Sequence, residues 1–474
     1  MKSLRLLLRF LTVGGLVLLL LIPLVMVRGI ISDRERYQAQ AIERIGQSTA
    51  GAQQVIGPLR VVPWEEVRSR TRVDAEGKPE IHQETVRGYL LQTPRTLQVS
   101  GGLKPNLRRI GLYEVRTYDW SGKLVAAFEP LVLEASAHRV YGRPLLVMGI
   151  SDVRGLIGTP SLNVDGRALA FQAGTGALSE RMSGVHAVLG EPGAALPASR
   201  MQLDLMLTGT ESLGISPVAD SNRIDLHSAW PHPLFGGRFS PNQRVVDDHG
   251  FRASWEISAL ANDTQAQLER GEGLLTRRQP LTERAGSIDG GIEGVALTGI
   301  DSIDVHLVDT VDVYTQADRA TKYGILFVVL TFVGFALFEL IKRLPIHPLQ
   351  YLLVGLALAI FFLLLLSLSE HIAFWQAYLI SATACIGLQF FYLSGVLRSW
   401  VRAAGFATTL TALYGVLYAL LLSEANALLM GSLLLFGILA AIMWLTRKVD
   451  WYELGSTPAQ DAPAPRNAPP PMPQ

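Results

Sequence analysis

Six apolar runs, each long enough to cross a lipid bilayer, constrain this chain more than any other feature. The first covers residues 10–27 and is uncharged; at ~1.5 Å per residue it spans about 27 Å, close to the hydrocarbon thickness of a membrane. Five more lie in the last third, at residues 323–341, 349–368, 372–397, 406–422 and 425–446, and of these only 323–341 contains a charge, Glu339. The sequence predicts six transmembrane helices around one long insertion, residues 28–322.

The basic residues that flank these runs all fall on one side of the predicted membrane. Counted along alternate connections, that side holds Lys2, Arg5, Arg9, Lys342, Arg343, Arg398, Arg402, Arg447 and Lys448, whereas the opposite hairpins hold Glu370, His371 and Glu424. Short basic flanks stay in the cytoplasm. We therefore expect residues 1–9 and 447–474 to be cytoplasmic and residues 28–322 to form a periplasmic domain of a bacterial inner-membrane protein.

The first apolar run, preceded by basic residues, also fits the pattern of a secretory signal peptide. The run is longer than the apolar core of about 7 to 15 residues typical of such peptides. It ends in Val25-Met26-Val27-Arg28, which is not a small-x-small cleavage pattern. We therefore expect an uncleaved anchor, and the topology of the later helices is the same under either reading.

The overall composition supports lipid contact and narrows the class of partner. Hydrophobic residues make up 49% of the 474 positions and charged residues only 18%, which is too apolar for an ordinary soluble protein. The net charge of +1 lacks the basic surplus that nucleic-acid binding needs. The single cysteine, Cys385, excludes an intrachain disulfide and a cysteine metal site. We expect membrane lipids and envelope components or proteins as partners, with no nucleic acid and no cofactor.

The long insertion has the sequence pattern of β-structure. Residues 201–207 and 302–309 alternate between apolar and polar side chains, and turn residues at 118–122 and 163–166 predict hairpins. The predicted fold class is therefore a membrane α-helical protein of six spans with a large β-rich extracytoplasmic domain, an antiparallel sheet or sandwich. Residues 31–45 have helical spacing, so the first helix should continue beyond the membrane, with a solvated face of Arg34, Glu35, Arg36, Glu43 and Arg44.

The C-terminal segment from residue 457 is rich in proline and alanine and ends in Pro-Pro-Pro-Met-Pro-Gln. Such a composition cannot bury a core, which predicts a disordered cytoplasmic tail. A polyproline ligand for a partner domain is the alternative interpretation.

Residues 228–237 combine prolines, aromatic residues, a histidine and glycines, which predicts a rigid loop rather than a strand. Its candidate interaction residues are Trp230, Pro231, His232 and Pro233. Carboxylates and imidazoles gather around it and could serve a metal or a hydrolase: Asp225, His227, His232, Asp247, Asp248 and His249. Their spacing matches no His-Glu-x-x-His, Gly-x-Ser-x-Gly or Walker pattern. We therefore expect loop residues hydrogen-bonded to the backbone, with a metal or hydrolytic site as the alternative.

The ionisable residues of the apolar region lie at helix ends rather than at the bilayer centre, which weakens a proton-relay interpretation. Glu339 precedes Lys342 and Arg343 by three and four residues, a spacing that predicts pairing on one helix face. Glu370 and His371 end the third predicted span. An interfacial cap is the favoured interpretation of these two residues, and the entrance of a transport path is the alternative.

Five blocks of sequence, separated but in order, resemble the CreD family of inner-membrane proteins. They are residues 322–327 with 330–332, 347–358, 366–371, 47–51 with 57–59, and the Trp-Pro-His-Pro of 230–233 with 250–255. The resemblance implies a cytoplasmic-membrane protein linked to cell-envelope integrity. It further implies membership of a regulon under a sensor kinase and response regulator, colicin tolerance and responses to cell-wall antibiotics. It carries over no catalytic residue and no cofactor, and the tail after Leu454 departs from the family pattern.

Two hypotheses of function follow. The first is a non-enzymatic envelope-maintenance protein whose periplasmic domain binds an envelope component or a protein. The second is a transporter or lipid-handling protein that uses the C-terminal helix bundle, with Glu370 and His371 at its entrance. An enzyme in the outer domain ranks third.

Overall fold

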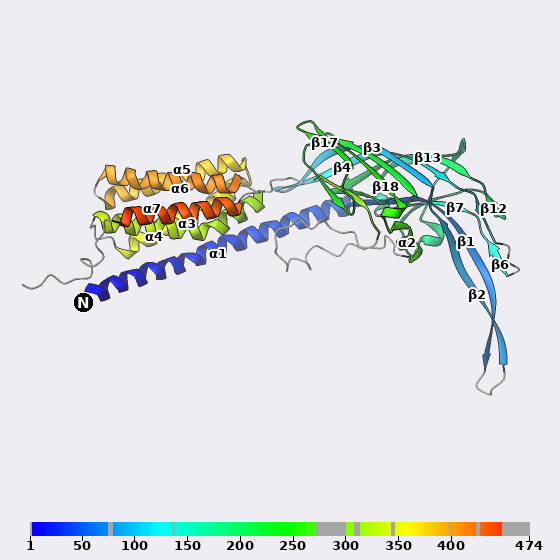
Figure 1. Cartoon of the computed structure of the whole chain (residues 1–474), viewed down its shortest axis with the longest axis horizontal. Helices are drawn as coiled ribbons and strands as arrows, with labels where there is room; N and C mark the ends of the chain where they lie inside the picture. Colours follow the sequence, from blue (N-terminus) through cyan, green and yellow to red (C-terminus); the bar gives the residue numbers. More distant parts are fainter. Residues whose placement is uncertain are drawn as a thin grey trace, which may run out of the picture. The chain divides into compact units, whose positions relative to one another are not determined.

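A computed structural model gives the three-dimensional structure of the chain (Figure 1). It describes residues 2–73, 79–134, 136, 138–271, 300–307, 313–342, 347–397, 399–422 and 427–447. The chain divides into two compact units, a helical unit of Met1–Glu35 with Val311–Gln474 and a β unit of Arg36–Thr310. The insertion predicted from the apolar runs corresponds closely to the β unit.

The predicted apolar runs coincide with long helices. In chain order these helices are α1 (Lys2–Ser48), α3 (Val313–Lys342), α4 (Pro348–Ser369), α5 (Phe374–Val396), α6 (Trp400–Leu422) and α7 (Ala427–Thr446). In the described part of the chain, four segments are long and apolar enough to cross a membrane, namely α1 from Gly14 onward, α4, α5 and α6. Several membrane-spanning helices are therefore present, and the count of six spans stays a proposal.

Some predictions fall on parts of the chain that the structure does not describe. These are the side chains of the proposed Glu339, Lys342 and Arg343 pairing, Glu424 in the last hairpin, and the proline-rich tail. They stay predictions.

One face of α1 is buried within the helical unit. Leu20, Leu24, Val27 and Ile31 recur every three or four residues and are at most 5% exposed, which is the stripe of a helix packed on its neighbours. A β-carbon at Gly355 of α4 would overlap Leu20, so glycine at this position lets the two helices approach closely.

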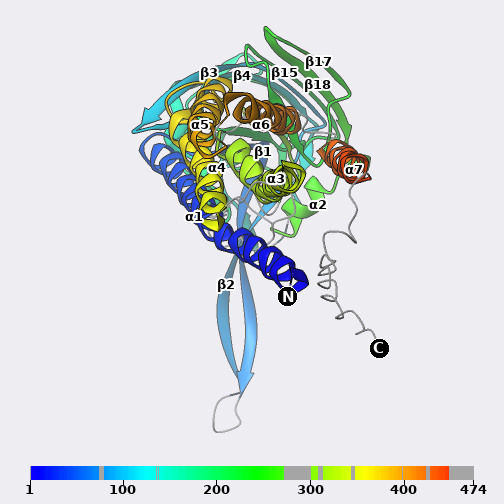
Figure 2. The ribbon, with the colours of Figure 1, turned by 90° about the vertical axis from the view of Figure 1, so that its left-hand side faces the viewer.

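The remaining helices pack in a regular order, seen nearly end-on in Figure 2. α4 contacts α3 and α5, and α6 also contacts α3 and α5. Aromatic rings fill the interior: the ring of Tyr414 lies 4.7 Å from the rings of both Phe327 and Phe361, measured between centroids. Tilted rings at this distance pack favourably, so three helices meet at Tyr414.

The β unit contains two large sheets. The first has the order β10 (Gln172–Ala173), β11 (Gly184–Val188), β7 (Leu145–Ile150), β1 (Gln53–Val73), β14 (Ser212–Ile215), β19 (Ile303–Leu307) and β16 (Pro233–Gly237), with β2 (Pro79–Gln92) and β6 (Arg139–Tyr141) also paired to β1. The second has the order β17 (Gln243–Asp247), β18 (Gly250–Ser258), β15 (Ser221–Ser228), β3 (Thr96–Ile110), β4 (Tyr113–Phe128), β13 (Ser199–Thr210), β8 (Leu156–Val164) and β9 (Arg167–Leu169). β1 and β2 continue past the first sheet as a two-stranded ribbon (Figure 1).

Shorter elements complete the β unit. They are a two-stranded sheet of β5 (Leu131–Val132) and β12 (Ala195–Leu196), the helix α2 (Thr264–Glu269), and the 3-10 turns η1 (Val153–Gly155), η2 (Gly176–Leu178) and η3 (Ala259–Ala261).

The expectation of purely antiparallel sheets is wrong, because each large sheet contains one parallel pair. β1 runs parallel to β14, and β15 runs parallel to β3. Both pairs join strands that are far apart in the sequence. Turn signals report only hairpins between neighbouring strands, so they carry no information on these pairings.

The two sheets share one hydrophobic core. Its fully buried members come from both sheets, for example Val55, Leu59 and Val305 of the first sheet with Trp120 and Ile224 of the second. This arrangement is the sandwich that the sequence predicted as an alternative to a single sheet. β13 confirms the predicted alternation, since its buried and exposed residues alternate along most of its length.

The two predicted turns differ in outcome. The turn at 163–166 joins β8 to β9 and is confirmed, whereas residues 118–122 lie inside the continuous strand β4. Gly122 pairs with Gly101 of β3, and both make room for the buried Trp120 ring. Asp119 accepts hydrogen bonds from Asn106 and Thr208 on the two neighbouring strands. These turn-like residues therefore serve packing within the sheet.

A substitution at this glycine tests the packing. A β-carbon at Gly122 would lie 2.6 Å from ring carbons of Trp120, so Gly122→Ala should destabilise the β unit by about 1–3 kcal/mol, the usual cost of overpacking a core. Gly190→Ala is the control, because a β-carbon there meets nothing within 4 Å. Thermal unfolding of the detergent-solubilised protein measures both, and equal stability of the two variants would contradict this packing.

Candidate functional site

The Trp-Pro-His-Pro segment is a loop up to His232 and enters a strand at Pro233, so the prediction of a loop through residue 237 is wrong from Pro233 onward. Pro233 begins β16, which pairs antiparallel with β19 and ends the first sheet. Proline cannot donate to a strand ladder and is therefore tolerated at the first position of an edge strand. Residues 229–232 form the connection that leads into it.

Trp230 organises this connection. Its backbone N–H donates to Ser228 Oγ at 3.1 Å, and its Nε1–H donates to the backbone oxygen of His232 at 2.9 Å. The Arg116 guanidinium of β4 stacks over the indole, 3.9 Å from the ring centroid, a cation–π contact. Trp230 is half-buried against the core, whereas His232 is exposed with its ring edge-to-face on the indole. The segment thus exposes the His232 imidazole against a tryptophan that hydrogen bonds and a cation–π contact hold in place.

The other carboxylates and imidazoles near this segment serve local contacts. Asp247 accepts a hydrogen bond from the backbone N–H of His249 at 2.8 Å, and Asp225 pairs with Arg223 at 3.2 Å. His227 lies on β15, over Gly102 of β3. Within the described residues, no group of three or more histidine, cysteine, aspartate or glutamate side chains could hold a metal ion. The metal or hydrolytic alternative therefore gains no support.

β19 departs from its predicted pattern of one dry and one wet face. Asp304 is only 8% exposed and accepts a hydrogen bond from Ser302 Oγ at 2.9 Å. Glycines on the adjacent strands, Gly214 and Gly236, face Asp304 and His306. Burial raises the pKa of Asp304 against the opposing effect of the Ser302 hydrogen bond, and burial lowers the pKa of His306. The apolar and polar residues of β19 do alternate in the sequence, but the polar side chains are buried or half-buried rather than exposed to solvent.

Glu370 in the helical unit is a nearly buried carboxylate. It follows α4 as its C-terminal cap residue, and its side chain is 6% exposed. An anion is unfavourable at the negative end of a helix dipole. Arg34 of α1 offsets this, with its Nε 3.1 Å from Glu370 Oε1. Arg34, expected on a solvated face, is therefore a partner of the predicted site residue.

His371 has a local role that agrees with the predicted cap. Its Nδ1 lies 3.1 Å from the backbone oxygen of Ser367, and its own N–H donates to the oxygen of Leu368. A carbonyl oxygen only accepts, so Nδ1 carries the proton in this contact. The imidazole thus satisfies a carbonyl at the end of α4 that has no partner within the helix.

A second ion pair joins α1 to α3. Arg28 Nε lies 3.4 Å from Asp318 Oδ1, and Lys322 Nζ lies 2.8 Å from Asp318 Oδ2. With Arg34 and Glu370, these residues form a set of two inter-helix ion pairs and one pair within α3, named here the ion-pair cluster. Its members border the apolar runs of three helices.

The far end of α1 is held within the β unit. Arg154 donates to the backbone oxygens of Gln47 at 2.6 Å and Gly46 at 3.3 Å, so its charge caps the negative end of the helix. Asp152 fixes the guanidinium through bonds of 2.8 and 2.6 Å. Burial acts to raise the pKa of Asp152, but hydrogen bonds from Arg154 and the Gly51 backbone outweigh it and leave this pKa below its usual value.

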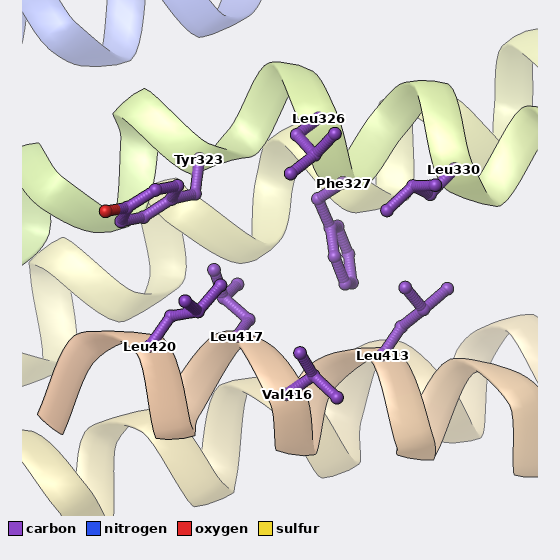
Figure 3. A pocket seen from close by; sticks show the side chains of 8 residues that line it. All are labelled: Tyr323, Leu326, Phe327, Leu330, Leu413, Val416, Leu417 and Leu420. Carbon is purple, nitrogen blue, oxygen red and sulfur yellow. The ribbon is translucent and has the colours of Figure 1, made fainter. Parts of the chain in front are cut away.

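A small apolar groove lies between α3 and α6, with a volume of about 10 Å³, which is room for about one water-sized molecule (Figure 3). Side chains of the two helices point toward one another across it: Tyr323, Leu326, Phe327 and Leu330 from α3, and Leu413, Val416, Leu417 and Leu420 from α6. The lining side chains are hydrocarbon except for the Tyr323 hydroxyl, so the groove offers almost no hydrogen-bonding group to a polar solute.

Sequence reasoning missed the partners of its own candidate residues. Arg34 was expected on a solvated face and Arg154 was not singled out, but the signals that could have singled out Arg34 were available. Arg34 follows an apolar run on the same helix, and Glu370 lies in a hairpin that the charge pattern places on the same side. The cap by Arg154 depends on a contact between residues more than 100 positions apart, which no local pattern encodes.

Apolar helices able to cross a membrane, together with a large two-sheet β unit, define an integral membrane protein with an inserted β domain. Comparison with known proteins agrees: the chain belongs to the family of the inner membrane protein CreD, whose model matches residues 5–452. The inner membrane protein CreD of Escherichia coli (strain K12) is 35% identical over 440 residues, covering 92% of each chain.

Solved structures add little to this assignment. Two crystal structures of the M1 zinc metallopeptidase from Deinococcus radiodurans, one of the enzyme itself and one of a mutant bound to a Tyr-Ser-Ala substrate, each align with 34% of this chain and 38% of their own. The identity is 8% and the TM-score 0.19 in both cases. A likeness this weak carries no inference about activity.

A double-mutant cycle tests the ion-pair cluster. Glu370→Gln and Arg34→Gln should each lower the free energy of unfolding in detergent, and the double variant should recover about 1 kcal/mol of the summed loss, because the pair is partly shielded from water. The Arg87 and Glu65 pair of the β unit is the control. Its atoms are 2.8 Å apart, but its side chains are 77% and 58% exposed, so its coupling should be unmeasurable. If the unfolding free-energy losses of Arg34→Gln and Glu370→Gln were strictly additive, the result would contradict a stabilising interaction between these two residues.

Proposed function

We propose that this chain is a non-enzymatic inner-membrane protein that supports cell-envelope integrity, and that its β unit lies in the periplasm and binds an envelope component or protein partner. The observation that carries the proposal is membership of the CreD family over residues 5–452. Tolerance of envelope stress, of cell-wall antibiotics and of colicins is the role proposed for it.

Charge and contact together support this orientation. The charge pattern assigns Arg28, Arg34, Asp318, Lys322 and Glu370 to the same outer side of the membrane. These residues also pair with one another within the helical unit. Charges inside hydrocarbon cost several kcal/mol, so ion pairs that border the apolar runs are expected at the membrane surface rather than at its centre.

The Trp-Pro-His-Pro segment is the proposed interaction surface. It combines an arginine stacked on a tryptophan with an exposed histidine, and tryptophan and arginine are enriched among residues that dominate binding energy at interfaces. It also leads into β16, which ends the described path of the first sheet. An edge strand offers backbone donors and acceptors to a partner.

Helix α1 is the proposed link between binding and membrane. It runs without interruption from Lys2 to Ser48. Arg154 holds its C-terminal end, and the ion-pair cluster holds it beside α3 and α4. The Arg28–Asp318 pair keeps α1 beside α3 when the Arg34–Glu370 pair is removed, and a signalling role is proposed for this helix.

A transporter or lipid-handling function is the second candidate. The apolar lining of the small groove between α3 and α6 is the observation in its favour, and Glu370 would then mark the polar entrance. This function requires the Glu370 carboxylate to take part in transport in addition to pairing with Arg34.

One complementation experiment separates the two functions. A deletion strain carrying variant genes is tested for sensitivity to detergents and β-lactams, with protein abundance measured by immunoblot. The proposed interaction surface predicts that His232→Ala loses most of the rescue, because its exposed ring is presented to a partner on Trp230, while Glu370→Gln combined with Arg34→Gln retains it. The alternative predicts the reverse. Unchanged sensitivity of the deletion strain under every envelope stress would contradict the envelope role itself.

A matched variant guards against misfolding. Trp230→Phe keeps an aromatic ring beneath Arg116 but removes the bond to the His232 oxygen. If this variant is present at normal abundance and rescues the strain only in part, the result supports a partner that binds the Trp-Pro-His-Pro segment in the conformation held by the Trp230 hydrogen bond.

A further inference from the structure

A column of polar side chains runs along one face of α5 inside the helical unit. Tyr378, Ser381, Cys385 and Gln389 follow one another at spacings of three, four and four residues, which places them on one side of a helix. All four are buried, with exposures of at most 5%. The rise from Tyr378 to Gln389 is about 16 Å, or roughly half the hydrocarbon thickness of a bilayer.

Two members of the column have no hydrogen-bond partner in the described structure. Gln389 is 2% exposed, and neither its Nε2 nor its Oε1 is bonded. Ser381 is fully buried, and its Oγ is unbonded. A buried amide or hydroxyl without a partner costs several kcal/mol in an apolar medium, so a bound molecule is the simplest way to satisfy both groups.

Other hydroxyls of the same helices behave differently. Thr331, Thr383 and Thr408 each donate to the carbonyl oxygen four residues earlier in their own helix, at 2.8–2.9 Å. This back-bonding is the usual way to hide a hydroxyl in a membrane helix. Ser381 does not use it, although it could, so its hydroxyl stays available to a ligand.

The column faces the interior of the bundle. The Tyr378 hydroxyl donates to the backbone oxygen of Tyr414 in α6 at 2.7 Å, and Cys385 Sγ lies 3.6 Å from the backbone oxygen of Ala357 in α4. The Tyr414 hydroxyl, on the facing helix, is likewise buried without a partner in the described structure. Donors and acceptors from α5 and α6 therefore lie between three helices.

We propose that this column is a hydrated binding site for a small, uncharged, hydrogen-bonding ligand, with water as its simplest occupant. The side chains named offer hydroxyls, a thiol and an amide but no charge, so neither an ion nor a charged headgroup is compensated there. Gln389 supplies both donor and acceptor, which suits a hydroxyl-bearing or amide-bearing molecule. The inference is independent of the envelope role, since it concerns only the helix bundle.

The single cysteine of the chain makes the test direct, because Cys385 lies between Ser381 and Gln389 and any thiol label reports on the column. The probe is 2-hydroxyethyl methanethiosulfonate, which is small, neutral and water-soluble, applied to the full-length protein in phosphatidylcholine liposomes. We expect modification of Cys385 in the folded protein, and at least tenfold slower modification by the anionic sulfonatoethyl analogue. No modification before denaturation in SDS would overturn the proposal.

Variants tie the reactivity to the column. Ser381→Ala and Gln389→Leu should each slow modification of Cys385 at least fivefold, whereas Thr383→Ala should leave it unchanged, since that hydroxyl bonds to its own helix. Removing a buried amide together with its bound partner can be nearly neutral for stability, so Gln389→Leu should keep the unfolding temperature of the parent. Equal labelling rates in all three variants would contradict a site built by Ser381 and Gln389.

Discussion

The structure depends on one constraint, that backbone polar groups surrounded by lipid must be satisfied within their own segment. This requirement makes the apolar runs helical, and α1 continues as a helix beyond its apolar run. The helix ends only at Ser48, where Arg154 supplies donors for the last carbonyls. Without that cap, the end of α1 would leave carbonyl oxygens to be satisfied by water alone.

The apolar runs determine where the long helices form, and ion pairs between these helices then help to fix how they pack. The ion-pair cluster joins residues that border different apolar runs, and the Arg34 pair balances a carboxylate that its surroundings disfavour. Glu370 is the clearest example, because burial and the dipole of α4 both oppose its charge. Arg34 counters these two effects from a different helix. Two kinds of contact therefore hold α1 against its neighbours. Arg34 pairs electrostatically with Glu370 of α4, and nearer the N-terminus of α1 the contact is apolar, as between Leu20 and Gly355.

Predictions from the sequence succeeded where the pattern was local and repetitive. Long apolar runs coincide with helices, and the alternation in β13 and the turn at Asp165 and Gly166 follow from neighbouring residues alone. They failed where distant residues decide the structure. Residues 118–122 look like a turn, but Gly122 and Asp119 serve a buried Trp120 and two neighbouring strands. The covered polar face of β19 and the parallel pairing of β1 with β14 have the same cause.

The candidate site shows the same division. The composition of Trp-Pro-His-Pro singled out residues that the structure does join, through the bond from Trp230 to His232. It gave no sign of Arg116, which is more than 100 positions away. Ser381 and Gln389 escaped notice because one hydroxyl and one amide in an apolar run look ordinary until neighbouring hydroxyls are seen to bond to their own helices.

The proposed topology places the β unit outside the cytoplasmic membrane and both ends of the chain inside. A protein with Cys385→Ser and Arg167→Cys carries one thiol, on the exposed strand β9. In intact spheroplasts, a membrane-impermeant maleimide should label this thiol fully without added detergent. Labelling only after the membrane is permeabilised would contradict the topology and the function built on it.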